Sequence, residues 1–381
     1  MKAKYLVIAI TAAALLGTSA CAEDAANAEQ PGEVVKIAAL YPATGQYAEY
    51  GKMFEEGFEL ALEKVNAEGG VKGKTLDVVY YDTQSDAKQD AAIAPQIAAD
   101  PDVIAVVGDY ASGASKAASP TFQQAGLIHY AFNNSAASFT DTGDKVWSPA
   151  IGQDVQQAFT ADTVAKAAKR IAVVYIENDW GKEAFGYFKA RAEQTGTEIV
   201  YESSYLADST DLSPILIPAR DSKPDAIVQI GYGPDGALVI NTLRDKLGYT
   251  GPYYGGQQLQ EYIDLAGANA EGSILAAAFI NDGVTDPKVV QFVEDFKAKY
   301  GKEPGGFQVT AYQAIIDLSH LANLTEPTRD GIFQALQTAD DIPLYLGDGG
   351  TFTFNQTTRK ADNILPVNIT VKDGKFVRYD G

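Results

Sequence analysis

The chain alternates between short apolar runs and longer segments whose apolar residues recur at helical spacing. The run at 34–40 (VVKIAAL) precedes a segment, 52–67, in which aromatic and aliphatic residues return every three or four positions. The alternation continues to residue 132 and resumes at residue 170. Continuous β-branched runs between helices are typical of parallel sheets that helices cover on both faces. The pattern therefore predicts an α/β fold.

The expected elements fall into two successive sets, which predict two Rossmann-like lobes. Ligands of such open sheets bind at the carboxyl ends of the strands, so we expect a cleft between the lobes. Strands are expected at 34–40, 75–81, 103–107, 127–132, 170–176, 198–205, 226–230, 253–255, 273–279, 350–354, 367–372 and 376–379. Helices are expected at 52–67, 87–98, from about 115, and at 182–195, 212–221, 236–247, 287–300, 308–321 and 331–338.

Length and charge narrow the class of protein. The chain has 381 residues, enough for two α/β lobes but too many for one compact core. A hydrophobic content of 46% indicates a folded globular protein, and a formal net charge of −20 argues against a nucleic-acid partner.

The N-terminus has the pattern of an export signal. Lys2 and Lys4 precede an apolar run, 5–16, which is shorter than the ~20 residues of a spanning helix. The single cysteine, Cys21, follows small residues. Either Cys21 is lipidated as in a bacterial lipoprotein, or Ala20-Cys21-Ala22 is an ordinary cleavage site. Both routes predict an exported protein, periplasmic or at the cell surface, with no disulfide and a flexible tether at 22–33.

The segment 105–115 (AVVGDYASGAS) predicts a strand, a turn of small residues and a helix, an arrangement that presents N–H groups to an anion. Ser112 in this turn is a candidate anion ligand. A nucleophilic role is disfavoured, because no G-x-S-x-G surrounds Ser112 and the chain has only His129 and His320. Two separated histidines and no cysteine after the signal peptide leave only carboxylates as metal ligands, which argues against a metal site.

The segment GYGPDG, 231–236, has the spacing of a dinucleotide fingerprint. Pro234 and Asp235 inside the turn, and the lack of an acidic residue after the next strand, argue against that function, and we expect no cofactor. We expect a helix-capping turn with Tyr232 pointing into a cleft. Tyr50, Tyr110 and Trp180 also stand at strand ends or turns, as in the aromatic walls of small-ligand sites.

The segment 34–82 closely resembles the opening of the type I periplasmic binding proteins. These are the substrate-binding components of ABC importers, and the resemblance is to the branched-chain amino acid (leucine/isoleucine/valine) group. The segment has the G-x-x-A-x-Y-G turn at 45–51, the N-A-x-G-G-V-x-G break at 66–73 and a strand that ends in Asp82. The similarity continues through IAVVGDYASGAS, GLIHYAFNNSAASFT and PDAIVQIGYGPDG and covers residues 34–381.

The resemblance implies a monomer of two lobes that close on the ligand around a hinge of three crossovers, near 153, 281 and 350–365. The expected division is a signal peptide at 1–21, the tether at 22–33, a first lobe of 34–153 with 282–350, and a second lobe of 154–281 with 351–381.

The resemblance also implies which residues bind the ligand. On the first lobe, Ser112 and Ser135 would hold a carboxylate, and the backbone carbonyl of Asn133 an ammonium group. Trp180 and Tyr232 would close over the ligand from the second lobe. The remaining pocket positions are Tyr50 and Phe307.

One position departs from the family pattern. The amino-acid binders have an acidic residue after the strand at 253–255, where it pairs with the ligand's ammonium. Gln257 stands here, unless the alignment shifts by one residue. A neutral Gln removes a charge-assisted hydrogen bond worth roughly 1.5–3 kcal/mol, which Asp109 or Asp235 would have to replace. An amino acid, an amine-free acid and an amide all remain candidate ligands.

The resemblance implies no catalysis. It implies docking of the closed form on a membrane permease, and membrane attachment only through the N-terminal lipid. A sensor that partners a receptor instead of an importer is the alternative, because the chain has no motif that separates the two.

Overall fold

The structure is a computed structural model that describes residues 33–381. The expected signal peptide, Cys21 and the tether up to residue 32 lie outside the described residues. Within the described part of the chain, no helix combines the length and apolar character needed to cross a membrane.

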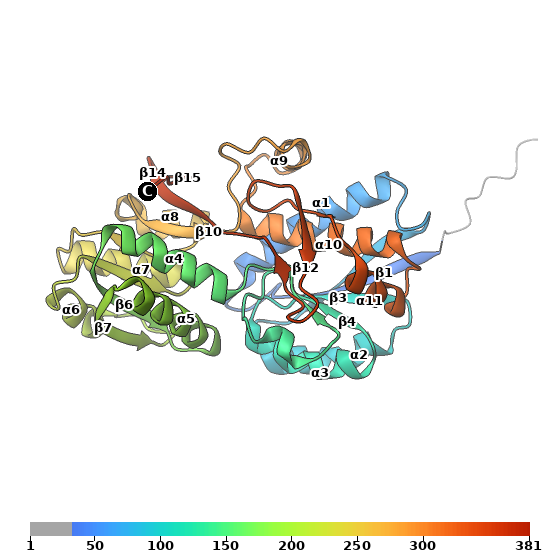
Figure 1. Cartoon of the computed structure of the whole chain (residues 1–381), viewed down its shortest axis with the longest axis horizontal. Helices are drawn as coiled ribbons and strands as arrows, with labels where there is room; N and C mark the ends of the chain where they lie inside the picture. Colours follow the sequence, from blue (N-terminus) through green and yellow to red (C-terminus); the bar gives the residue numbers. More distant parts are fainter. Residues whose placement is uncertain (1–32) are drawn as a thin grey trace, which may run out of the picture. The chain divides into compact units, whose positions relative to one another are not determined.

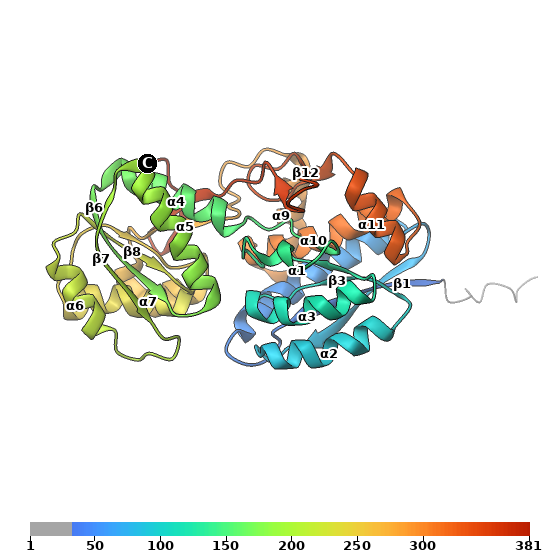
Figure 2. The same ribbon diagram turned by 60° about the horizontal axis from the view of Figure 1, so that its bottom comes forward.

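The first sheet has five parallel strands in the order β2-β1-β3-β4-β5. Helices α1 and α10 pack against each other on one face, and α2 and α3 cover the other, which faces the viewer in Figure 2. The elements are β1 (Val34–Tyr41), β2 (Thr75–Asp82), β3 (Val103–Val107), β4 (Ile128–Tyr130), β5 (Val146–Trp147), α1 (Ala48–Ala67), α2 (Ala87–Ala99), α3 (Ser112–Gln124) and α10 (Gly306–Leu324).

Two-sided cover explains the apolar run of the first strand. Side chains alternate between the two faces of a strand. Ile37 and Ala39 belong to the hydrophobic cluster that includes Phe54 of α1, and Ala38 and Leu40 belong to the cluster under α2 and α3. Both sets are buried, so every position from 37 to 40 is apolar.

The second sheet has seven strands in the order β15-β14-β10-β9-β8-β6-β7. Strands β6 to β10 are parallel, β14 is antiparallel to β10, and β15 is antiparallel to β14. Figure 1 shows this sheet with α4 and α5 beside it. The elements are β6 (Arg170–Ile176), β7 (Glu198–Tyr205), β8 (Ala226–Ile230), β9 (Tyr253–Tyr254), β10 (Ile274–Ala277), β14 (Val367–Lys372), β15 (Lys375–Arg378), α4 (Gln153–Ala167), α5 (Asp179–Thr195), α6 (Ser213–Asp221), α7 (Gly233–Asn241) and α8 (Gln260–Ala266).

The remaining elements lie between and after these sheets. A small antiparallel sheet has the order β11-β12-β13. The elements are α9 (Pro287–Tyr300), α11 (Arg329–Thr338), β11 (Ile342–Pro343), β12 (Thr351–Phe354), β13 (Ala361–Asp362), the 3₁₀ helices η1 (Phe139–Thr142) and η3 (Gly267–Ala270), and the π-helix η2 (Thr242–Lys246).

The segment 351–362 packs on the first sheet, although we expected it in the second lobe. The ring of Phe354 lies 5.3 Å from that of Trp147 in β5, and Ser148 forms a backbone bridge with Lys360. The chain joins the second sheet only at Val367, the start of β14. The rest of the division into lobes remains a prediction.

The two-lobed α/β architecture is as predicted, but two helices of the second lobe, α4 and α8, were not predicted. Helix α4 buries Gln153 and Gln157, so part of its buried face is polar and it lacks the apolar stripe that marks a packed helix. Helix α3 begins at Ser112 instead of about residue 115. Helix α4 and the earlier start of α3 both contribute polar residues to the same cavity.

Candidate ligand-binding site

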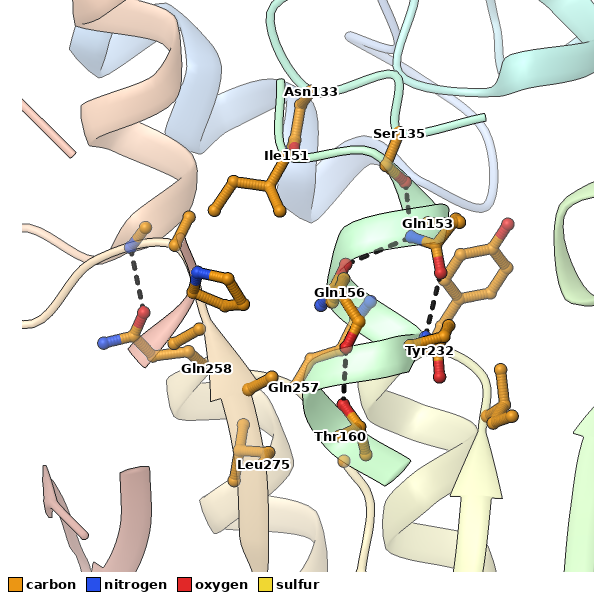
Figure 3. Close-up of a pocket in the computed structure, with 18 of the residues that line it drawn as sticks. Asn133, Ser135, Ile151, Gln153, Gln156, Thr160, Tyr232, Gln257, Gln258 and Leu275 are labelled. Atoms are coloured by element: carbon orange, nitrogen blue, oxygen red, sulfur yellow. Dashed lines mark hydrogen bonds between the residues drawn. The ribbon is translucent and has the colours of Figure 1, made fainter. Parts of the chain in front are cut away.

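A cavity of about 160 Å³ lies between residues that follow the strands of both sheets. The first sheet contributes Tyr110, Ser112, Phe132, Asn133 and Ser135, and the second contributes Trp180, Gln229, Tyr232 and Gln257. Residues of α4 and β10, among them Gln156 and Leu275, complete the wall (Figure 3). The volume is close to that of the ~150 Å³ protein cavity that holds a benzene molecule. The cavity therefore suits a small molecule.

The first wall presents the start of α3. Because Ser112 is the first residue of this helix, the N–H groups of its first turn have no acceptor within the helix and favour an anion. The Ser112 hydroxyl donates to Asn134 Oδ1 over 2.9 Å, and the backbone N–H of Ala136 donates to the same oxygen. The turn after β4 is thereby tied to the start of α3.

Ser112 has no histidine partner. The ring of His129 is fully buried in β4, where Nδ1 lies 3.0 Å from the Ser119 hydroxyl and Nε2 donates to the carbonyl of Gly108. Burial lowers the pKa of His129 to about 4, so the imidazole is neutral at physiological pH. The pair Ser119–His129 is a buried structural contact.

The hydroxyl of Ser135 connects three parts of the structure. It accepts a hydrogen bond from Gln153 Nε2 of α4 over 2.7 Å and one from Trp180 Nε1 of α5 over 3.0 Å. A hydroxyl has one proton and two lone pairs. Since both lone pairs are used, the Ser135 proton is left to donate into the cavity.

The second wall begins at the turn between β8 and α7. Tyr232 is the N-cap residue of α7, and its ring stacks on that of Trp180 at 5.2 Å. The Asp235 carboxylate accepts from the Tyr232 backbone N–H over 3.3 Å, and burial raises the pKa of Asp235 to about 6. A Cβ on Gly236 would lie 2.7 Å from the Cα of Gly256. The glycine motif therefore permits close packing around a helix cap, as expected.

Gln257 lies where the two walls meet. Its Oε1 accepts from the Tyr50 hydroxyl over 2.6 Å and from the Gly233 backbone N–H over 3.1 Å. Tyr50 is only 2% exposed and does not line the cavity. Its ring stacks on Tyr110 at 4.5 Å and meets the edge of Phe307 at 5.1 Å. Tyr50 therefore supports the wall from behind.

The side chains that line the cavity are apolar, aromatic or neutral polar, and none of them is charged. Glutamines are frequent among them, and the α4 glutamines form a chain (Figure 3). Gln157 Nε2 donates to Gln153 Oε1 over 2.8 Å, and Gln153 Nε2 lies 3.1 Å from Gln156 Oε1. Helix α4 lacks an apolar stripe in the sequence, so these residues were missed. Only the run QDVQQ pointed to amide side chains there.

The structure brings most of the predicted site residues together. Ser112, Asn133, Ser135, Trp180, Tyr232, Gln257 and Phe307 all line the cavity. Tyr50 is the exception, lying behind Gln257. Among residues 33–381, no group of three or more His, Cys, Asp or Glu side chains is placed to hold a metal ion.

Comparison with known proteins extends over nearly the whole chain. A family model described as periplasmic binding protein matches residues 34–374. A Brucella suis protein named Leu/Ile/Val-binding protein homolog 7 is 26% identical, over 98% of this chain and 96% of its own. The structure of a leucine-binding protein from Thermotoga maritima has a TM-score of 0.83 at 25% identity, covering 91% of this chain and 97% of that one. A Streptococcus pneumoniae branched-chain amino acid transporter substrate-binding protein, solved with isoleucine, has a TM-score of 0.80 at 23% identity, covering 91% and 100%.

Proposed function

Since this chain belongs to the type I periplasmic binding proteins, in the branched-chain amino acid group, we propose that it is the extracytoplasmic substrate-binding component of an ABC importer. It captures a small carboxylate-bearing ligand, an amino acid or a related organic acid or amide, and catalyses nothing. The observation that supports this most is the small cavity lined from both sheets.

Capture relies on complementary contributions from the two walls. The N–H groups of the first turn of α3, which begins at Ser112, and the hydroxyl of Ser135 bind the carboxylate. Closure brings Trp180, Tyr232 and Gln257 over the ligand, and the Trp180–Ser135 and Gln257–Tyr50 hydrogen bonds hold the walls together. A ligand that contacts both walls shifts the population towards the closed form.

The closed protein then docks as a monomer on the permease subunits of the importer. If Cys21 is lipidated, the lipid keeps the protein at the membrane surface. A sensor that presents its closed form to a receptor is the alternative function, and it makes the same use of the cavity.

A thermal-shift screen tests the binding function. The mature protein is unfolded, dialysed to remove bound ligand, refolded and mixed with amino acids, organic acids and amides. A ligand at a hundredfold excess over its dissociation constant stabilises the fold by about 2.7 kcal/mol. We expect a clear rise in Tm with at least one carboxylate-bearing compound. A refolded protein that responds to none would contradict the proposal.

A further inference from the structure

The cavity offers no anionic partner to a positively charged group. No lining side chain is charged. Asp109 and Asp154 each have a buried carboxyl oxygen without a partner, but neither residue lines the cavity. Two other nearby carboxylates are already engaged. Asp235 accepts the Tyr232 backbone N–H, and Glu183 accepts the Ser138 hydroxyl over 2.6 Å, with Lys116 3.8 Å away. An ammonium group that leaves water for such a cavity loses hydration without gaining an ion pair. The cavity therefore disfavours a ligand with a free amine.

The orientation of the Gln257 amide is determined by its neighbours. A backbone N–H can only donate, so the Gln257 atom that faces the Gly233 N–H is the oxygen. The Tyr50 hydroxyl donates to the same oxygen. Gln257 Nε2 has no hydrogen-bond partner among the described residues, and Gln257 lines the cavity. The group left for a ligand is therefore the amide NH₂, which only donates.

Other unpaired groups at the cavity are mostly donors as well. Asn133 Nδ2 is buried without a partner, and the Ser135 hydroxyl proton is available because its oxygen already accepts twice. Among the described residues that line the cavity, Gln157 has the one buried side-chain acceptor without a partner, its Oε1. Buried donors need acceptors. A ligand rich in acceptor oxygens satisfies this set.

We infer that the ligand is an amine-free organic acid. Its carboxylate lies against the Ser135 hydroxyl and the first turn of α3, and a second acceptor oxygen, of the oxo or hydroxy type, receives the Gln257 amide N–H. This inference rests on the proposed function and narrows its ligand class.

A matched series of ligands tests the chemistry at fixed shape. The probes are L-leucine, 4-methyl-2-oxopentanoate and 4-methylpentanoate, with the corresponding three compounds on the phenylalanine skeleton. Affinities for the ligand-stripped protein are measured by isothermal titration calorimetry. In at least one series we expect the oxo acid to bind about tenfold or more tighter than its amino acid, in line with the strength of a charged group's hydrogen bond.

The variant Gln257→Glu replaces the amide NH₂ of Gln257 with a carboxylate oxygen and adds a negative charge. Both neighbours of Gln257 donate to Oε1, so a carboxylate keeps both hydrogen bonds and the variant should fold. The donor NH₂ becomes an anionic oxygen. We expect oxo-acid affinity to fall about tenfold or more and amino-acid affinity to rise. Gln260→Glu is the control, because Gln260 is exposed in the neighbouring helix and does not line the cavity.

The outcomes distinguish a failure of the inference from a failure of the proposed function. If the wild-type protein binds the amino acid tighter than its oxo acid in each series, the inference is wrong and the proposed function stands. If Gln257→Glu and Gln260→Glu have equal effects, Gln257 does not contact the ligand and the inference also fails. If neither these compounds nor any compound of the thermal-shift screen binds the wild-type protein, both the proposed function and the inference are wrong.

Discussion

The two walls of the cavity hold their polar groups in different ways. On the first wall, short side chains sit at turns after β3 and β4 and are tied to each other, as Ser112 is to Asn134. On the second wall, the long side chains of Trp180 and Gln257 reach across and form hydrogen bonds with Ser135 of the first wall and with Tyr50 behind it. The first wall is therefore positioned largely by backbone, whereas the second depends on single side chains. Substitutions should have unequal effects on the two.

The largest effect is expected for Trp180→Ala. This change removes the ring that stacks on Tyr232 and the N–H that donates to Ser135. Central aromatic anchors of this kind are commonly worth 2 kcal/mol or more, so ligand affinity should fall about 30-fold or more. Trp180→Phe keeps a ring without the N–H and should lose less. Calorimetry with the best ligand from the screen measures both, and equal affinities for Trp180→Ala and wild type would refute the importance of the second wall.

Within the first wall, Ser135→Ala should weaken binding more than Ser112→Ala. The Ser135 hydroxyl accepts from two residues outside its own wall and keeps a proton for the ligand. Its loss leaves those donors unsatisfied and should cost about tenfold in affinity. Ser112 already donates to Asn134, and alanine keeps the backbone N–H at the start of α3, so its loss should be about threefold. The same titrations measure both. Equal losses of affinity would contradict this ranking. They would favour the expectation from the sequence, which gave the two serines the same role.

Apolar periodicity was a good guide to the sheets and a poor one to the cavity. The strands at 103–107, 170–176 and 226–230 were predicted with the bounds that the structure has, because each is largely buried on both faces and, apart from Arg170 and Gln229, its sequence is apolar. Helix α4 was not predicted, because three of the residues with which it lines the cavity, Gln153, Gln156 and Gln157, are glutamines. Hydrophobic patterns find surfaces that pack against apolar neighbours and miss those that bind polar ligands.

The placement of individual site residues shows the same limit. The resemblance brought Trp180, Tyr232 and Gln257 together, because they follow strands whose ends meet at one edge of a sheet. It did not distinguish the residues that line the cavity from Tyr50, which is buried behind Gln257 and donates a hydrogen bond to it. That distinction depends on side-chain packing between segments about 200 residues apart (207 for this pair), which no local pattern encodes.

The smallest effect on binding, and a distinct one on stability, is expected for Asp235→Asn. Each wall has a buried carboxyl group behind it, Asp109 on the first and Asp235 on the second, and burial raises the pKa of both. For Asp235 the folded-state pKa of about 6 exceeds the ordinary aspartate value of 3.8, which the unfolded chain has. Between these values the folded state holds the proton more tightly than the unfolded state, so this group's contribution to stability falls as pH rises through the window and levels off above it.

Asparagine stays neutral at every pH and can still accept the Tyr232 backbone N–H, so Asp235→Asn should lack this loss. We expect the variant to exceed the wild type in unfolding free energy by about 1–3 kcal/mol at pH 7.5, with the difference disappearing near pH 4. Urea unfolding at both pH values measures it, and subtracting the wild-type curve cancels the contributions of Asp109 and the other carboxyls. Asp208→Asn, at an exposed position, is the control. A stability difference that is the same at both pH values would show that burial does not raise the pKa of Asp235 in the folded protein above its value in the unfolded chain.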